Sequence, residues 1–327
     1  MFRFTVPDGK TGVEQQKKEI QAQLEEFIRH EALGEIFSIL GTDRERILSE
    51  YDFRKHSDGK VLELQELERS EENVAELQKR ANANIPAEMK KQLYERFWEL
   101  GMMDINRPLR KDYDRIVVLG GSYEAVWDRT AAAAKWRTDR VRFIDGLSCY
   151  RPINPTERGT SKKQYSSAET EFGVMSDAVE TVFSPGCGFA DAFCGDRNIN
   201  SISCIRTFET GDADSRFRVY AAPSAEPALR RADTGDSIAY YLNCEGVTEA
   251  ESILFITNNR HCNRQYLQIL CEMLKRGGII PFDIIGCSEL EELKTYETYN
   301  LKYYIQEIIA MLNWKRSLET VLESVGG

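Results

Sequence analysis

The densest group of chemically capable side chains follows a short apolar run late in the chain. Residues 253–256 (ILFI) suit a strand buried on both faces. Residues 257–264 (TNNRHCNR) then bring together a hydroxyl, three amides, two arginines and one of the three histidines. Residues 265–275 continue with apolar side chains at helical spacing. In open α/β sheets ligands bind beyond the carboxyl ends of the strands, where this polar turn would lie. The alternative is a solvated loop that leads into a surface helix.

His261 is the natural candidate for a general acid or base in this turn, because an unperturbed histidine titrates near neutrality. Arg264 can bind a phosphate or carboxylate through paired donors, and Thr257 and Asn258 can bind the same ligand. Against this, a single histidine in such a turn is more often structural than catalytic.

A second polar turn follows the predicted first strand, residues 115–119 (RIVVL). Gly120 and Gly121 would let a ligand approach the backbone, and their amides with the Ser122 hydroxyl could bind anionic oxygens. A Gly-Gly pair is a weak signal and is not the GxGxxG motif, whose absence argues against a conventional dehydrogenase. Arg129, in the helix predicted for residues 123–136, could bind the same anion, although such an arginine more often lies on the surface or in a salt bridge.

Alternating strand and helix patterns predict an α/β fold with a doubly wound, mostly parallel sheet of about five strands over residues 108–327. Insertions are expected near residues 148–166 and 184–214, with a short strand near residues 201–205. An amphipathic helix is expected from about residue 293 to residue 325. The five strands are expected near residues 115–119, 141–144, 217–221, 253–256 and 278–285, the last at a sheet edge because it contains Pro281.

Residues 1–107 have the pattern of an all-helical N-terminal module. Breaks are expected at Gly34 and at residues 41–43, a charged helix at residues 62–81, and a last helix that opens at Pro86. No motif here carries chemistry, so most of its charges are interpreted as solvated helix faces. The more specific hypothesis is that residues 12–105 form a helical module that covers a ligand site or binds a protein partner.

Composition restricts the class of protein. The 327 residues carry 43 basic and 53 acidic side chains, a net charge of −10, which argues against broad electrostatic binding to nucleic acid. There is no apolar run of about 20 residues and no apolar leader, so the sequence predicts a soluble, cytoplasmic protein without a membrane span. The eight cysteines lack zinc spacing and are interpreted as reduced, mostly buried thiols, with no metal site expected.

The polar turns occur in the order found in the YdcF-like family of unknown function, which includes the SanA and ElyC groups, and the sequence resembles a divergent member. The resemblance covers about residues 113–290. Asp145-Gly146 stands where the family has a second Gly-Gly, after the predicted second strand, and Thr234-Gly235-Asp236-Ser237 where it has Thr-x-Glu-Asn. The other matching positions are Gly120, Gly121, Arg129, Thr170, Glu171, Met175, Thr257, His261 and Arg264.

The resemblance implies a Rossmann-like fold with a ligand site at the carboxyl-terminal rim of the sheet. Many members carry membrane helices and are linked to the cell envelope, whereas this chain shows no such helices. At least one member binds S-adenosylmethionine, which makes this molecule a candidate ligand. Methyl transfer ranks below simple binding, because Asp145 is the only acidic residue placed for a ribose after the predicted second strand.

The resulting hypothesis is a site for an anionic nucleotide-like or phosphorylated molecule, with hydrolase or transferase activity. The alternative is a non-catalytic ligand sensor, or an interaction protein that acts through the helical module. Glu171 and Asp236 would orient the arginines or bind ligand hydroxyls, and with His261 they are the predicted catalytic residues. The predicted ligand-binding residues are Gly120, Gly121, Ser122, Arg129, Thr234, Thr257, Asn258 and Arg264.

Overall fold

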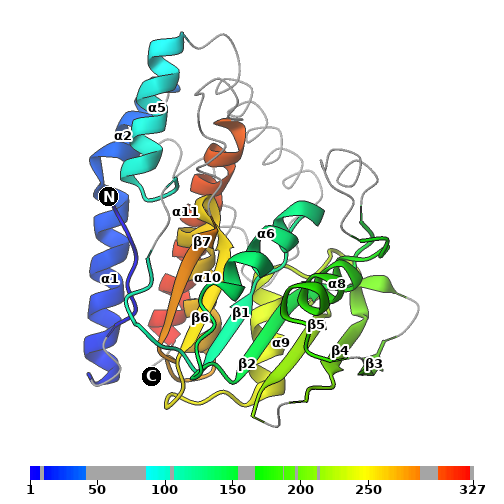
Figure 1. Cartoon of the computed structure of the whole chain (residues 1–327). Coiled ribbons are helices and arrows are strands. Elements are labelled where there is room, and N and C mark those ends of the chain that lie inside the picture. Colours follow the sequence, from blue (N-terminus) through cyan, green and yellow to red (C-terminus); the bar gives the residue numbers. More distant parts are fainter. Residues whose placement is uncertain are drawn as a thin grey trace. The chain divides into compact units, whose positions relative to one another are not determined.

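The computed structural model describes residues 1–7, 11–41, 86–103, 107–153, 166–186, 188–195, 198–211, 214–287 and 301–324. The chain divides into two compact units. Unit 1 contains residues 1–104, 259–275 and 288–327, and unit 2 contains residues 105–258 and 276–287. Figure 1 labels the helices and strands of both units.

Unit 2 is built on one mixed, mostly parallel sheet. The strands that the structure describes follow the order β3-β4-β5-β2-β1-β6-β7, with β5, β2, β1, β6 and β7 parallel and β3 and β4 antiparallel. Every residue of β1, β6 and β7 is buried, as is typical of parallel strands. Their bounds are β1 (Arg115–Val118), β2 (Phe143–Cys149), β3 (Phe189–Cys194), β4 (Ser203–Phe208), β5 (Arg216–Ala222), β6 (Ile253–Asn258) and β7 (Phe282–Cys287).

The predicted α/β class with a mostly parallel sheet is confirmed. The count of about five strands is not, because β3 and β4 add two antiparallel strands within the insertion expected near residues 184–214. The five predicted strands correspond to β1, β2, β5, β6 and β7, and β7 lies at an edge as Pro281 indicated. A 3-10 turn, η1 (Ile199–Ser201), lies between β3 and β4 in the sequence.

Helices pack on both faces of this sheet. A Cβ atom on Gly146 of β2 would lie 2.6 Å from the Met175 Cγ, so α8 (Glu171–Phe183) covers that face. Asp145, the preceding residue, points to the opposite face, where it accepts a 2.8 Å hydrogen bond from Tyr241 of α9 (Thr234–Glu245). The helix α6 (Tyr123–Ala134) packs against α8 and therefore lies on the α8 face (Figure 1).

Unit 1 is helical. It contains α1 (Val13–Arg29), α2 (Glu31–Ile39), α5 (Ala87–Glu99), the 3-10 turn η2 (Asn259–His261), α10 (Cys262–Lys275) and α11 (Leu301–Ser324). Its core includes fully buried phenylalanines on α1, α2 and α5. No helix among the described ranges is long and apolar enough to cross a membrane.

The break predicted at Gly34 is wrong, because α2 runs through this residue. The break lies at His30, whose backbone leaves the helical conformation and whose Nδ1 accepts from the Ala32 amide at 3.3 Å. The side chain thus caps α2, which is a role that serine or aspartate more commonly fills. The turn at residues 42–43, the helix at 62–81 and the start of the C-terminal helix before residue 301 lie outside the described residues.

Candidate functional site

The glycine turn after β1 makes room for protein side chains. A Cβ atom on Gly120 would collide with the Glu171 carboxylate and would lie 2.7 Å from the Leu147 carbonyl oxygen. A Cβ atom on Gly121 would lie 3.0 Å from Nη1 of Arg129. Close packing inside unit 2 therefore favours glycine at position 120, where a Cβ would meet backbone, and leaves little room for a side chain at position 121.

Arg129 connects the ends of two neighbouring strands. Its side chain is buried, at 2% exposed. Nε donates to Oδ1 of Asn258, at the end of β6, at 2.7 Å. Nη1 donates to the Leu119 carbonyl oxygen at 2.9 Å and to that of Gly120, just beyond β1. Nε and Nη1 of Arg129 thus bind oxygens of the protein itself. The predicted contact of Arg129 with a ligand phosphate stays a prediction.

Glu171, the first residue of α8, holds a second arginine at the same edge of the sheet. Nε of Arg151 donates to Glu171 Oε2 at 2.6 Å, and Nη2 donates to the Gly121 carbonyl oxygen at 2.9 Å. The Cys149 thiol donates to Glu171 Oε2 at 3.5 Å. Burial, with the Glu171 charge beside it, raises the pKa of Cys149 to about 12, so this thiol is neutral and a poor nucleophile.

The arginines fix the orientation of two peptide groups. The carbonyl oxygens of Gly120 and Gly121 are bound by Arg129 and Arg151. In a trans peptide the N–H of the next residue points opposite to the carbonyl, so the amides of Gly121 and Ser122 point away from these arginines. Among the residues that the structure describes, neither amide donates a hydrogen bond. Ser122 is exposed and caps α6 by position, but its side chain makes no capping hydrogen bond.

Sequence reasoning missed Arg151 and Cys149 because it ended the second strand at Ile144. The structure continues β2 to Cys149 and places Asp145 and Gly146 inside the strand. The predicted placement of Asp145 after that strand, where it was the only acidic residue considered for a ribose, is therefore wrong. Its carboxyl group is fully buried beneath α9.

Asp236 has a structural role at the start of α9. Its side chain accepts from the Asp233 amide at 2.9 Å, while Asp233 accepts from the Asp236 amide at 3.0 Å. Arg230 forms an ion pair with the same carboxylate. Thr234 is the first residue of α9. This capping box explains the short polar entry to the helix, and a catalytic role for Asp236 stays a prediction.

The predicted acid or base, His261, belongs to a separate cluster in unit 1. Its Nδ1 lies 2.9 Å from Oε1 of Glu307 on α11, and Nε of Arg264 donates to Oε2 of Glu307 at 2.6 Å. Arg264 also donates to Gln268 at 2.8 Å, and Nε of Arg260 donates to His261 Nε2 at 3.3 Å. Nη2 of Arg264 also lies 3.4 Å from Nδ1, but the Glu307 carboxylate is closer and favours the tautomer with hydrogen on Nδ1.

Glu307 carries the negative charge of this cluster. Burial disfavours its ionised form, but the charge of Arg264 and the hydrogen bonds from Arg264 and His261 outweigh burial and lower the pKa of Glu307 to about 2. The sequence contained one signal for this residue. Glu307 interrupts the apolar stripe of α11, three residues after buried Tyr304 and four before buried Met311, where a carboxylate requires a partner.

The structure brings together five of the predicted site residues within unit 2, namely Gly120, Gly121, Arg129, Glu171 and Asn258. It pairs His261 and Arg264 through Glu307 within unit 1. The Thr257 side chain at the end of β6 is buried, and its Oγ1 makes no hydrogen bond to any described residue. The convergence of both sets on one rim stays a prediction.

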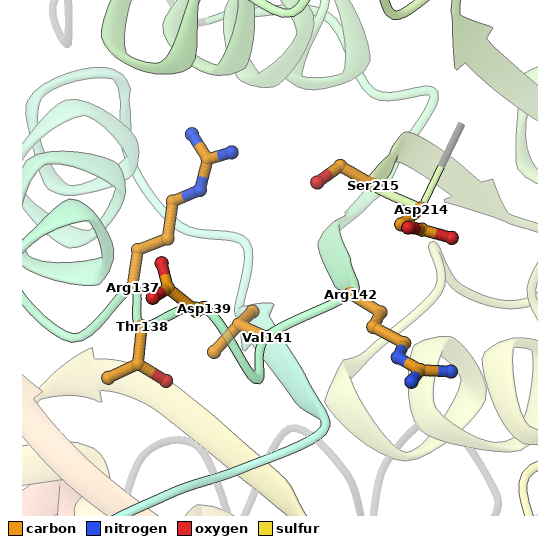
Figure 2. A pocket seen from close by; sticks show the side chains of 7 residues that line it. All are labelled: Arg137, Thr138, Asp139, Val141, Arg142, Asp214 and Ser215. Atoms are coloured by element: carbon orange, nitrogen blue, oxygen red, sulfur yellow. The ribbon is translucent and has the colours of Figure 1, made fainter. Parts of the chain in front are cut away.

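A hollow of about 560 Å³ lies at the amino ends of β2 and β5, whereas the glycine turn follows the carboxyl end of β1 (Figure 2). The guanidinium groups of Arg137 and Arg142 point away from each other there, and both side chains are exposed. The arrangement therefore lacks convergent donors for one ligand. Within the described ranges, no three His, Cys, Asp or Glu side chains are placed to hold a metal ion.

No protein-family model matches the chain, and no curated protein or solved structure matches it either.

Proposed function

We propose that the protein binds an anionic nucleotide-like or phosphorylated small molecule at the carboxyl ends of β1 and β6. The observation that carries this proposal is the pair of amides at Gly121 and Ser122, turned away from Arg129 and Arg151 and followed by the N-terminus of α6. Backbone amides at a helix N-terminus bind anions because the helix dipole and the unpaired N–H groups act together. The two arginines support these amides from behind and add positive charge.

The strand order also supports the proposal. Numbered by chain order, the parallel strands β5-β2-β1-β6-β7 read 3-2-1-4-5, which is the order of Rossmann-like, doubly wound sheets. In such sheets the ligand lies where the order reverses, here between β1 and β6. The turn from Gly120 to Ser122 follows β1, and Asn258 ends β6, so both border that position. The YdcF-like resemblance rests on these same turns.

His261 is the candidate general acid or base of this proposal. A carboxylate bound to Nδ1 fixes the tautomer of a catalytic histidine and stabilises its protonated form, which is what Glu307 would do here. On this basis the activity would be a hydrolysis or a group transfer on the bound molecule. S-adenosylmethionine is a candidate ligand, because its carboxylate can occupy the same amides.

The test measures thermal unfolding of the wild type and of two Ser122 variants, each with and without added ligand. The ligands are nucleotides, nucleotide sugars, sugar phosphates, polyprenyl phosphate analogues and S-adenosylmethionine. A ligand at about 100 times its dissociation constant should stabilise the wild type by about 2.7 kcal/mol. Ser122→Asn is the matched control, and Ser122→Asp adds a carboxylate; both residues cap helices well. A shift that Ser122→Asn keeps and Ser122→Asp loses supports the site.

If a ligand still raises the unfolding temperature of Ser122→Asp, the ligand binds elsewhere. If no compound raises the unfolding temperature of the wild type, these common metabolites are excluded as ligands. Catalysis is tested separately with His261→Gln, which leaves the Arg264–Glu307 ion pair in place. Binding with loss of turnover supports the catalytic assignment. Binding without turnover in the wild type supports the sensor alternative.

A further inference from the structure

The edge strand β3 is exposed along its whole length. All six residues from Phe189 to Cys194 are exposed, with Phe189 at 50% and Phe193 at 58%. In the described part of the chain β3 pairs only with β4, and Figure 1 shows it at the end of the sheet. The opposite edge strand, β7, is buried at every residue. An open edge strand is a template for pairing with another strand.

β3 lacks the features by which proteins usually protect such an edge. The strand contains no proline and no lysine, and its register with β4 runs from Phe189↔Phe208 to Cys194↔Ser203 without a bulge. Its one charged side chain, Asp191, is bound by Arg206 of β4 through two hydrogen bonds of 2.8 Å and 2.7 Å. The edge is therefore apolar apart from one neutralised charge.

The direction of the free backbone groups follows from the ladder. The Gly188 carbonyl oxygen accepts from the Glu209 amide at 2.8 Å, so this opposed pair is a hydrogen-bonded one. Hydrogen-bonded and non-hydrogen-bonded pairs alternate along an antiparallel ladder. The N–H and C=O groups of Phe189, Asp191 and Phe193 therefore point away from β4.

The sequence of the strand matches itself in reverse. Residues 189–193 read Phe-Ala-Asp-Ala-Phe in both directions. We propose that β3 pairs antiparallel with β3 of a second copy of this chain, about a two-fold axis through Asp191. Phe189 then faces Phe193 of the second copy, alanine faces alanine, and all three outward residues of each strand occupy hydrogen-bonded positions.

The charges are compatible with this axis. Two aspartates directly opposite each other would normally repel. Each Asp191 is already neutralised by its own Arg206, so the row across the axis reads Arg206, Asp191, Asp191, Arg206 and has no net charge. The Arg206 guanidinium also lies 3.8 Å from the centroid of the Phe189 ring, which holds both side chains on one face of the sheet.

The expected dimer is weak and reversible. A six-residue strand pair with four half-exposed phenylalanine rings would bury roughly 900 Å² in total, below the size of most stable interfaces. The proposal does not depend on the ligand site at β1 and β6, so each can fail without the other.

Sedimentation equilibrium of the full chain from low to high micromolar concentration tests the proposal. The wild type is expected to shift from monomer to dimer. Phe193→Lys should weaken the dimer at least about tenfold, because lysine protects sheet edges. The matched control is Leu229→Lys, which adds the same charge at an apolar side chain that is 62% exposed and lies outside β3. A monomer at every concentration overturns the proposal, and so does equal weakening by both variants.

Two measurements test the register. Amide hydrogen exchange at high concentration should slow at Phe189, Asp191 and Phe193 of the wild type, and unchanged exchange in a dimer would exclude β3 as the interface. Asp191→Cys places two thiols at the axis, where a short bismaleimide should join them. The wild-type Cys194 thiols would be about 20 Å apart and should not react in this way. A dimer in which Asp191→Cys gives no cross-link overturns the two-fold register.

Discussion

The buried carboxyl group of Asp145 should make the stability of unit 2 fall as the pH rises. It lies in β2 beneath α9 and is fully buried. Tyr241 donates to its Oδ2, while Oδ1 makes no hydrogen bond to a described residue. Arg115 lies 3.7 Å away but is bound more closely by Glu245, at 3.0 Å. The charges of the neighbouring arginines and glutamates balance one another, so the negative charge of an ionised Asp145 would be poorly compensated.

Burial is the main cause of the perturbed ionisation, and repulsion from Glu245 adds to it. Together they raise the pKa of Asp145 from its ordinary 3.8 to about 7 in the folded protein. A carboxyl group with a raised folded pKa favours folding fully below its unfolded pKa and loses that contribution as the pH rises through the folded pKa. The difference corresponds to at most about 4 kcal/mol, lost between about pH 4 and pH 7.

Asp145→Asn replaces the carboxyl group with an amide that cannot ionise. The variant should match the wild type near pH 4 and exceed it by up to about 4 kcal/mol at pH 8, measured by urea unfolding of both proteins across this range. Asp114→Asn is the control of opposite sign. Hydrogen bonds from Arg140 and Ser252 outweigh partial burial and lower the pKa of Asp114, so this variant should lose stability near neutral pH. An Asp145→Asn variant that is less stable than the wild type at pH 8 would refute the reasoning.

Two further substitutions test the clusters around the site. Gly120→Ala should cost about 1–3 kcal/mol in urea unfolding, because the new Cβ would meet the Glu171 carboxylate and the Leu147 carbonyl oxygen; a change near zero would show that the turn relaxes. Glu307→Gln should cost about 3–5 kcal/mol near neutral pH, because it removes the charge that partners Arg264, and no loss would contradict a buried ion pair. Since the lowered pKa of Glu307 favours folding above its ordinary value of 4.5, the difference between variant and wild type should shrink as the pH falls from 4.5 towards 2.

Strands with a continuous apolar run were predictable from the sequence. β1 and β6 are buried at every residue and contain the apolar runs at residues 116–118 and 253–256 that predicted them. β7 is also buried at every residue, but it begins at Phe282, four residues later than expected. β2 was predicted too short, because Asp145 and Gly146 interrupt its run. What compensates them is distant in sequence, namely Tyr241 for the carboxyl group and Met175 for the missing side chain. Local pattern cannot reveal partners of that kind.

β3 was missed for the opposite reason. Its six residues are all exposed, so no alternation between a buried and an exposed face marks it as a strand. The partner strand β4 was predicted in part, because the short strand expected at residues 201–205 overlaps Ser203–Phe208. Pairing with β4, which in turn pairs with the core strand β5, gives β3 its place in the sheet, and pairing is a property of the fold.

The glycine turn after β1 shows why a short motif supports two interpretations at once. Gly120 lacks a side chain so that Glu171 can approach, Glu171 holds Arg151, and Arg151 binds the Gly121 carbonyl oxygen. Arg129 binds the Gly120 carbonyl oxygen in the same way. Packing alone would explain every one of these contacts. Yet because a peptide group has two ends, fixing the carbonyls inside the protein also fixes the amides on the other side. The residues that make the turn structurally necessary are therefore the ones that would orient it for an anion.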